Sequence, residues 1–460
     1  MKKVYTITFG CQTNVYDSSR MIDILKIRDY SETNNLEEAD VIIMNTCYIR
    51  EKASEKVFSE LGKLKMLKQK KIEVGGYLVI AVTGCVAKAK GDEIFKKSPI
   101  VDIVLGCSSY HKIGKMVDLA FENYNFSRSS NLIDIDFKKE EKFALLPKTR
   151  VIRSVSETIA IQDGCDKFCS YCVVPYTRGR EYSRPFSDVV NEASYLADNG
   201  VREITLLGQN VDNYNSTDQH GSAVNLVDVI EAISQINGIE RIKYLSSYPS
   251  QFSDDLIYAH RDIKKLMPLV YIPVQSGSNR VLKLMNRRYT REQYLELVQK
   301  IKENVANVAF SSDFIVGFAG ETEDDFEETL SLAKEVNYAL SFSFKYSPRP
   351  NTVGIKMPNQ IAEDVKIDRL NRLQDLLNSQ QINFNYSFIG KEVVVLVENK
   401  SKDSNNLFFG RTEYGQAVIL DRSGYNIGIG DLAKVKISSA NLRTLKGDVV
   451  KKSIVNYTEI

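Results

Sequence analysis

Six of the seven cysteines of the chain fall into two groups whose thiols could hold inorganic cofactors. Cys165, Cys169 and Cys172 stand in GCDKFCSYC, a C-x3-C-x2-C triplet directly after the expected strand ETIAIQ. Three thiolates on one loop can bind a single iron–sulfur cluster. Structural zinc is the alternative, but it prefers four ligands, and no histidine or fourth cysteine lies nearby. The spacing favours a [4Fe-4S] cluster with one open iron over zinc or accidental buried thiols.

Three further cysteines each follow an apolar run near the N-terminus. Cys11 follows TITFG, Cys47 follows VIIMNT and Cys85 follows VIAVTG. The carboxyl ends of parallel strands meet at one sheet edge, so these thiols could form a second cluster site. Cys107 also ends an apolar run, IVDIVLG, and by spacing alone it could be a fourth ligand. The alternative for Cys107 is an ordinary buried thiol.

The elements that must position these thiols begin with alternating strands and helices. Residues 1–125 show the βαβ pattern of a parallel α/β sheet domain, with a helix expected from about Tyr16 and another over 53–71. The preferred interpretation of the lysines in the 53–71 helix is a solvated face, and the alternative is a patch that binds RNA. Residues 126–153 carry a charge run and Pro147, and they are predicted to be a linker.

The alternation resumes in residues 154–385 with six strand–helix steps, ending in a helix over 362–385. Six steps predict a partial (β/α)6 barrel, because eight steps would need about 250 residues. Residues 386–455 change to short strands punctuated by glycines, which predicts a small C-terminal antiparallel β-barrel of the oligonucleotide-binding kind. The chain is therefore expected to be a multidomain α/β protein.

Composition sets the limits on function. Of the 460 residues, 26% are charged and 43% hydrophobic, which excludes a mainly disordered chain. The net charge is +2, so any nucleic-acid surface must be local. We expect no membrane span and no signal peptide. The odd number of cysteines then favours reduced thiols in a cytoplasmic protein.

Together these features resemble a known family, the radical S-adenosylmethionine methylthiotransferases, over nearly the whole chain. The sequence is most similar to the MiaB-type tRNA enzymes, which carry a C-terminal TRAM domain. The residues that carry the resemblance are FGCQTN (9–14), NTCYIREKASEK (45–56), TGCVAK (83–88), IQDGCDKFCSYCVVPYTRGREYSRP (161–185), LGQNV (207–211), PVQSGS (273–278), DFIVGFAGET (313–322) and YSPRPNT (346–352). Thr13 and Ala319 depart from the family pattern, which commonly has Met and Pro there.

The resemblance implies two [4Fe-4S] clusters and S-adenosylmethionine as cofactors. Cys165, Cys169 and Cys172 would hold the cluster that cleaves S-adenosylmethionine to a 5′-deoxyadenosyl radical, which abstracts hydrogen from C2 of an isopentenylated adenosine. Cys11, Cys47 and Cys85 would hold the auxiliary cluster, whose methylated sulfur joins that carbon. Cys107 matches no ligand of the family. The implied partners are tRNA, an electron donor and a sulfur source, the last two not specified by the residues.

Candidate contacts to the cofactor follow strand ends: Gly208, Gln209 and Asn210 in LGQNV, and Asp313 and Gly317 in DFIVG. Gln275 and Ser276 in PVQSGS could face either the cofactor or the target base. A bare turn is the alternative for each. RNA contact is expected from Arg178, Arg180, Arg184, Arg287, Arg288, Phe408, Phe409, Arg411, Lys434, Lys436 and Arg443. The two phenylalanines cannot both be core in an alternating strand, and the alternative for each arginine is a structural ion pair.

Two alternative functions stay open on sequence alone, one of the same class and one of another class. The methylthio group could go to threonylcarbamoyladenosine in tRNA or to a ribosomal protein. The chain could also be a non-catalytic iron–sulfur protein that binds RNA, although the intact triplet argues against that hypothesis. The mass of the substrate after reaction, and cleavage of S-adenosylmethionine, distinguish these hypotheses from methylthiolation of dimethylallyladenosine at position 37 of tRNA.

Overall fold

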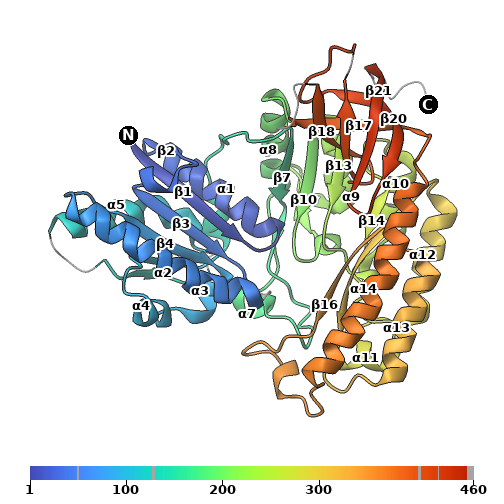
Figure 1. The fold of residues 1–460 in the computed structure, drawn as a ribbon, viewed down its shortest axis with the longest axis horizontal. Coiled ribbons are helices and arrows are strands. Elements are labelled where there is room, and N and C mark those ends of the chain that lie inside the picture. The colour runs from blue at the N-terminus through green and yellow to red at the C-terminus, as the bar shows by residue number, and fades with distance from the viewer. Residues whose placement is uncertain (49–50, 127–129, 138, 402–405, 423, 453–460) are drawn as a thin grey trace.

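The computed structural model describes residues 1–48, 51–126, 130–137, 139–401, 406–422 and 424–452 (Figure 1). Residues 49 and 50 of the 45–56 motif, parts of the expected linker and the last residues of the expected C-terminal barrel lie outside these ranges. Among the described residues, no helix is both long and apolar enough to cross a membrane.

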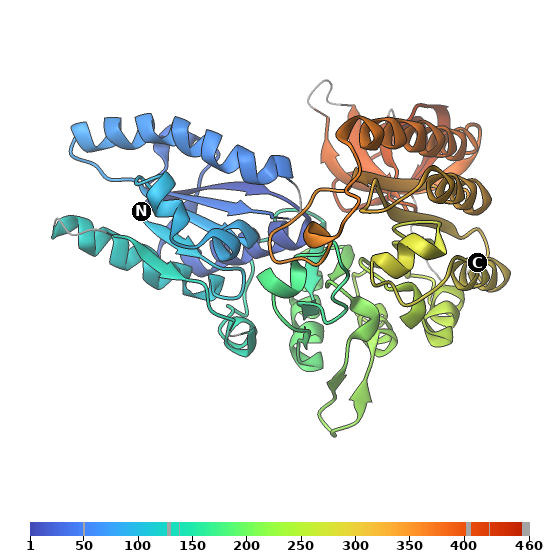
Figure 2. The same ribbon diagram turned by 90° about the horizontal axis from the view of Figure 1, so that it is seen from below.

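The N-terminal domain is built on six parallel strands in the order β2-β1-β3-β4-β5-β6. Its strands are β1 (Lys2–Phe9), β2 (Tyr30–Glu32), β3 (Val41–Thr46), β4 (Val79–Gly84), β5 (Ile103–Leu105) and β6 (Leu132–Asp134). Its helices are α1 (Gln12–Lys26), α2 (Glu51–Glu73), α3 (Cys85–Lys90), α4 (Glu93–Lys97) and α5 (Ile113–Asn125). Helices cover both faces, which is why β3 and β4 are buried apolar runs without alternation (Figure 2).

Two apolar cores lie on the two faces of this sheet. On one face, α1 and α5 contribute residues such as Leu25 and Val117. On the other, α2 contributes Val57, Leu61 and Leu64, the face that the helical spacing predicted. The sheet is therefore filled on both sides, and only the strand ends remain to carry polar chemistry.

Three details differ from the sequence-based expectation. Helix α1 begins at Gln12, directly after Cys11, and not near Tyr16. The short strands β2 and β6 were not predicted, because three residues are too few to show a period. The stretch 126–153 contains β6, which pairs with β5, and α6 (Lys139–Ala144), so part of the expected linker completes the first domain.

The second domain is the expected open barrel of six parallel strands. Two sheets, β7-β10-β13 and β14-β15-β16, follow one another in chain order, and a parallel bridge between Ile242 and Leu266 joins them. The strands are β7 (Ser156–Ala160), β10 (Glu203–Leu207), β13 (Arg241–Tyr244), β14 (Leu269–Tyr271), β15 (Ala309–Val316) and β16 (Leu340–Lys345). The barrel does not close between β7 and β16, so the fold prediction of a partial (β/α)6 barrel is confirmed.

Helices surround the barrel on its outer side (Figure 1). They are α8 (Phe186–Asp198), α9 (Leu226–Ser234), α10 (Asp254–Asp262), α11 (Asn279–Leu284), α12 (Arg291–Asn304), α13 (Glu323–Val336) and α14 (Glu363–Tyr386). The short helix α7 (Val174–Thr177) lies instead beside α3 of the N-terminal domain. Short pairs β8 (Gln162–Asp163) with β9 (Tyr182–Ser183) and β11 (Ser216–Thr217) with β12 (Ala223–Val224) lie in the loops. Capping boxes begin α9, α12 and α13, at Asn225, Thr290 and Thr322.

The C-terminal barrel is closed, with the strand order β17-β18-β19-β21-β20. Its strands are β17 (Glu392–Lys400), β18 (Leu407–Thr412), β19 (Ala417–Asp421), β20 (Leu432–Ala440) and β21 (Thr444–Lys452). At Gly447 a Cβ would lie 2.3 Å from the carbonyl oxygen of Lys436, so only glycine allows this close approach of two strands.

The C-terminal barrel is fixed to the amino ends of the central strands. Arg241, the first residue of β13, donates hydrogen bonds to the carbonyl oxygens of Val394 (2.8 Å) and Arg411 (2.7 Å). The Tyr414 hydroxyl donates to the carbonyl oxygen of Asn307, two residues ahead of β15 (2.9 Å). These strands end at the opposite side of the domain, where the cysteine loop lies.

Candidate iron–sulfur sites

The loop that carries Cys165, Cys169 and Cys172 follows β8 and is held by backbone hydrogen bonds from three directions. Cys165 N donates to Gly179 O (3.1 Å), Ser170 N donates to Met285 O (2.9 Å), and Gly354 N donates to Ser170 O (2.7 Å). The loop turns sharply at Phe168, a non-glycine residue in the left-handed region with φ 49°. The three thiols are thus placed by α7, α11 and the segment around Gly354 as well as by their own loop.

The chemistry of these three thiols fits a cationic metal cluster. Burial raises the pKa of Cys165 to about 11, and the charge of Cys169 adds to this effect. Burial also raises the pKa of Cys172, again with a contribution from Cys169. Thiols that disfavour each other's ionisation are stabilised as thiolates when iron is bound between them.

Arg287 lies against this loop. Its Nη1 approaches the Cys169 sulfur at 3.7 Å, and its Nη2 donates to Pro273 O at 2.8 Å. The guanidinium lies over the rings of Tyr248 and Tyr289, with 4.3 and 5.0 Å to the ring centroids. A positive charge held at the sulfur of a ligand stabilises the thiolate form.

The N-terminal thiols come together at the carboxyl edge of the first sheet. Cys11 is the N-cap of α1, and Cys85 is the first residue of α3. A Cβ at Gly10 would lie 2.6 Å from the Cβ of Cys47, so glycine is needed for the loops after β1 and β3 to meet. The hydrogen bond between Cys11 and Cys47 lowers the pKa of Cys11 to about 5 against the effect of burial.

Cys107 lies beside Cys85 in the same buried apolar cluster as Val173. Its thiol also donates to the carbonyl oxygen of Thr177 at 3.0 Å. Contact with Cys107 lowers the pKa of Cys85 to about 7, although burial opposes this shift. The same contact, with burial, raises the pKa of Cys107. Cys85 therefore favours the ligand form and Cys107 the protonated form.

No three His, Cys, Asp or Glu side chains of the described residues converge tightly enough to hold one metal ion. A cluster does not require such convergence, because each thiolate binds a different iron atom. The soft thiolate donors of both groups suit iron–sulfur ligation.

The predicted cofactor residues of LGQNV contact protein groups. Gln209 joins the two cysteine regions: Gly164 N donates to its Oε1 (2.5 Å), and its Nε2 approaches the Thr13 hydroxyl at 3.4 Å. Asn210 is buried and donates to Glu181 and Gln251 (3.0 and 2.9 Å). A Cβ at Gly208 would lie 2.8 Å from Gln162 Oε1, so this glycine permits close packing of the loop on β8.

The other predicted residues lie in the segment after β14, within β15 and directly after it. Gln275 is buried and left-handed, with φ 72°, and its backbone is paired with β15. The Asp313 carboxylate accepts from the Tyr271 hydroxyl at 2.5 Å. Gly317 has φ 70°, and a Cβ there would collide with Lys366 of α14 at 2.4 Å. Ser276 is fully buried beside Thr329, so it does not face a cavity.

Several arginines expected to touch RNA are structural ion pairs. Arg178 is 2% exposed and pairs with Asp17 and Asp163, and Arg184 is buried against Glu192. These two expectations were wrong, because the arginines lie between the two domains. The sequence also gave no separate indication of Asp17, which follows Cys11 by six residues.

The remaining residues predicted to bind RNA are distributed over two surfaces. Arg180 and Arg288 are exposed near the cysteine loop. On the C-terminal barrel Phe408 is core and Phe409 is half-buried, in agreement with the expected alternation. Lys434, Lys436 and Arg443 are exposed, Lys434 pairs with Glu392, and Arg411 is half-buried with Glu398 as its partner.

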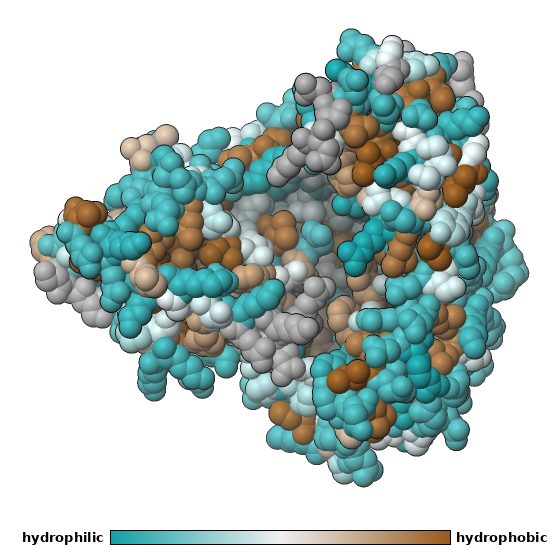
Figure 3. Space-filling model, viewed as in Figure 1, coloured by the Kyte–Doolittle hydropathy of each residue, from teal (hydrophilic) through white to brown (hydrophobic). Residues whose placement is uncertain are grey.

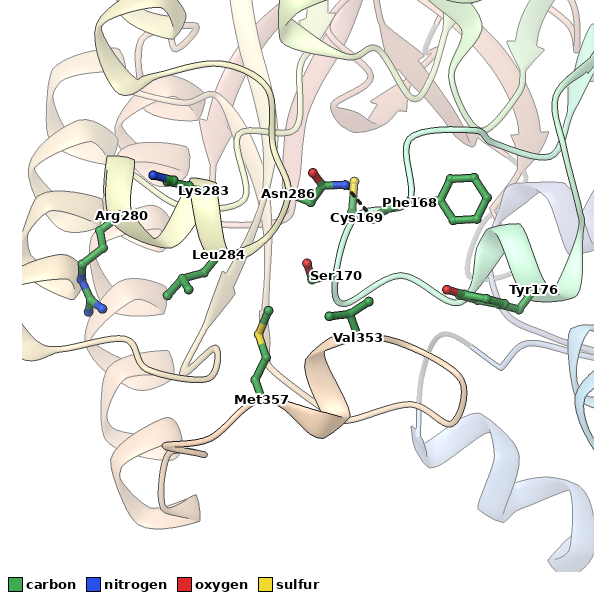
Figure 4. A pocket seen from close by; sticks show the side chains of 10 residues that line it. All are labelled: Phe168, Cys169, Ser170, Tyr176, Arg280, Lys283, Leu284, Asn286, Val353 and Met357. Carbon is green, nitrogen blue, oxygen red and sulfur yellow. Dashed lines mark hydrogen bonds between the residues drawn. The ribbon is translucent and has the colours of Figure 1, made fainter.

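A pocket of about 610 Å³ opens beside the cysteine loop. Figure 4 shows Phe168 and Tyr176 on one side of Cys169, and Arg280, Lys283 and Leu284 on the other. The sequence did not predict this pocket, because its walls come from three separate segments, within residues 168–176, 280–286 and 353–357. A hollow lies between the N-terminal domain and the rest of the molecule on the face seen in Figure 3.

Comparison with known proteins divides the chain as the structure does. Residues 3–106 match the family described as "Uncharacterized protein family UPF0004". Residues 159–333 match the radical SAM superfamily, and residues 387–450 match the TRAM domain. The three matches correspond to the first sheet, the open barrel and the C-terminal barrel.

Full-length relatives match nearly the whole chain. A protein of Zymomonas mobilis is 45% identical over 447 residues, 97% of this chain and 96% of its own length. A protein of Orientia tsutsugamushi is 45% identical over 453 residues, 98% of this chain and all of its own length. Both are named tRNA-2-methylthio-N(6)-dimethylallyladenosine synthase.

Among solved structures, the radical S-adenosylmethionine methyltransferase TsrM from Kitasatospora setae, with cobalamin and a [4Fe-4S] cluster bound, has a TM-score of 0.55. It is 12% identical, and the match covers 77% of this chain and 78% of that one. At this identity the likeness concerns the fold alone.

Proposed function

The chain belongs to the family of tRNA-2-methylthio-N(6)-dimethylallyladenosine synthases, and from this premise we propose that it adds a methylthio group to C2 of N6-dimethylallyladenosine at position 37 of tRNA. The observation that carries the proposal is the placement of two cysteine triplets at the carboxyl ends of two parallel sheets, on one domain boundary. A binding protein without catalysis would not need both sets.

Cys165, Cys169 and Cys172 would hold the cluster that binds S-adenosylmethionine, and Cys11, Cys47 and Cys85 would hold the auxiliary cluster. When bound, these groups supply the radical that removes hydrogen from C2 and the sulfur that replaces it. The backbone hydrogen bonds that hold the first three thiols on one loop and the contact between Cys11 and Cys47 at the second site support this assignment.

The protein's own residues orient the two sites and exclude water from them. Arg287 keeps a positive charge at Cys169, and the bonds of Gln209 fix the distance between Gly164 and Thr13. The glycines Gly208 and Gly317 let the surrounding strands pack closely. Such preorganisation keeps a reactive radical beside its substrate carbon.

The C-terminal barrel is the proposed RNA contact. Its TRAM match, the exposed Lys436 and Arg443, and the half-buried Phe409 support phosphate contact and base stacking. Arg180 and Arg288 are the proposed contacts near the reacting base. Gln275 and Asp313 remain proposed neighbours of S-adenosylmethionine, since Gln275 follows β14 and is paired with Phe314, the residue after Asp313 in β15.

The test starts from anaerobic reconstitution. We expect about eight iron atoms per chain, as two [4Fe-4S] clusters require. Incubation with dimethylallylated tRNA, S-adenosylmethionine and a reductant should yield 2-methylthio-dimethylallyladenosine, detected by mass spectrometry of the nucleosides. Methylthio mass on threonylcarbamoyladenosine or on a ribosomal protein would contradict the proposal, as would a lack of S-adenosylmethionine cleavage.

A further inference from the structure

Four charged side chains are buried together between the two cysteine sites. Asp17 of α1, Lys142 of α6, Asp163 of β8 and Arg178 are each at most 2% exposed. Arg178 donates from Nη2 to Asp17 (2.7 Å) and from Nη1 to Asp163 (2.9 Å). Lys142 lies 2.7 Å from Asp163 and 3.6 Å from Asp17. Each of the two cations therefore pairs with both carboxylates.

The two carboxylates belong to the two cysteine regions. Asp17 lies on the helix that Cys11 caps, and Asp163 lies two residues ahead of Cys165. The planar guanidinium of Arg178 uses one nitrogen for each carboxylate, and a lysine has no such fork. A movement of α1 relative to the loop after β8 would break one of these bonds.

The segment that leads to Arg178 also contacts the N-terminal thiols. Helix α7 lies between Cys172 and Arg178, and Val173, at its start, packs against Cys85 and Cys107. Cys107 donates to the carbonyl oxygen of Thr177, the residue before Arg178. The charge of Arg178 favours the thiolate forms of Cys11 and Cys85. One short helix and one arginine thus touch both sites.

We propose that Arg178 is a positioning residue that fixes the auxiliary cysteines relative to the radical-cluster loop through its fork between Asp17 and Asp163. The inference rests on the proposed function, in which the methylthio sulfur must meet the substrate carbon from which hydrogen was removed. The relative position of the two cysteine sites then decides whether the sulfur reaches that carbon. A small misplacement would leave radical formation intact and reduce only sulfur insertion.

The experiment compares three variants with the wild type. Arg178→Gln removes the fork, and Arg178→Gln combined with Asp17→Asn does so without leaving an unpaired buried carboxylate. Arg178→Lys keeps the charge without the fork. The control is Arg150→Gln with Glu157→Gln in a second buried charge network, in which Arg150 also pairs with Asp23 and Glu192 and contacts Ser19 of α1 across the same boundary.

Two measurements are made on each protein. Amide hydrogen exchange of the metal-free protein reports on residues 11–17 and 162–172 without any substrate. We expect exchange of both segments to rise about tenfold in the Arg178 variants and to stay unchanged in the control. In the reconstituted enzyme, we expect the ratio of 5′-deoxyadenosine to methylthiolated product to rise about tenfold, with iron content kept.

Restoration of the wild-type ratio by Arg178→Lys would overturn the proposal, because charge alone would then be sufficient. An equal rise of the ratio in the Arg150 control would also overturn it. If the wild type makes no methylthiolated product, the proposed function fails, and the exchange measurement on metal-free protein still decides whether Arg178 links the two segments.

Discussion

Cys85 and Cys107 lie side by side at the edge of the N-terminal sheet, and their contact gives the two thiols opposite character. The contact lowers the pKa of Cys85 to about 7, whereas the same contact and burial raise the pKa of Cys107. Spacing alone could not separate the two residues. The contact supports Cys85 as a ligand and Cys107 as a protonated neighbour.

Cys107→Ser should therefore retain about eight iron atoms per chain and methylthiolation of tRNA, because serine keeps a donor for Thr177 O. Iron analysis with the absorption spectrum of the reconstituted protein checks this expectation. Cys85→Ser is the matched variant and should retain only about four irons. Equal loss of iron in both variants would mean that Cys107 is itself a ligand.

The two sites should separate functionally. Cys169→Ala is expected to abolish both cleavage of S-adenosylmethionine and tRNA modification, since it removes a ligand of the radical cluster. Cys47→Ala should leave cleavage largely intact and abolish sulfur insertion. Chromatography of 5′-deoxyadenosine and mass spectrometry of tRNA nucleosides measure the two activities. Cleavage that fails equally in Cys47→Ala would contradict this division.

Adjacent arginines should have different roles. Arg287 is enclosed by Tyr248 and Tyr289 and faces Cys169, so Arg287→Met should lower S-adenosylmethionine cleavage about tenfold or more with tRNA affinity kept. Arg288 is exposed, so Arg288→Ala should weaken tRNA binding without loss of cleavage. The slope of the logarithm of the binding constant against the logarithm of the salt concentration should fall by about one in magnitude. Cleavage assays and binding titrations at several salt concentrations test both, and exchanged outcomes would refute the assignment.

The barrel should lose stability in acid through His260. Burial lowers the pKa of His260 to about 3, and its Nε2 lies 2.7 Å from the Tyr244 hydroxyl. The unfolded chain, with a histidine pKa near 6.5, binds a proton that the folded protein does not. The stabilisation is complete above about pH 6.5 and is lost as the pH falls toward 3, about 2 kcal/mol of it between pH 6.5 and 5.

His260→Gln keeps a partner for Tyr244 and removes the titration. Thermal unfolding of the metal-free protein at several pH values should therefore show a shallower loss of Tm below pH 6.5 in the variant. Parallel curves for the two proteins would show that His260 does not contribute to the acid sensitivity.

The regular part of the fold was predictable from the sequence because continuous apolar runs alternate with stretches of helical period. VIIMNT and VIAVTG predicted buried parallel strands, and the cysteines after them predicted a shared edge. The three-residue β6 carries no such period, and its pairing with β5 depends on tertiary contacts. Short elements and domain boundaries could therefore be located only in the structure.

The roles of polar residues were harder to predict. Arg178 and Arg180 are two positions apart and identical in type, yet one is buried between Asp17 and Asp163 and the other is exposed. The partners of Arg178 lie 161 and 15 residues away, so no local pattern distinguishes the two arginines. The spacing of Cys165, Cys169 and Cys172 is informative because one loop carries all three thiols, whereas the role of an arginine depends on distant neighbours.

The position of the C-terminal barrel determines how long a ligand must be to contact both this barrel and the cysteine loop. The barrel is bonded at Arg241 and Asn307, near the amino ends of the central strands, and the cysteine loop lies beyond their carboxyl ends. Strand β15 alone has eight residues and is about 25 Å long at about 3.3 Å per residue. A free nucleoside cannot span that separation, whereas a folded RNA arm can. If the C-terminal barrel binds RNA as proposed, this separation would favour substrates long enough to reach both places, independently of base recognition.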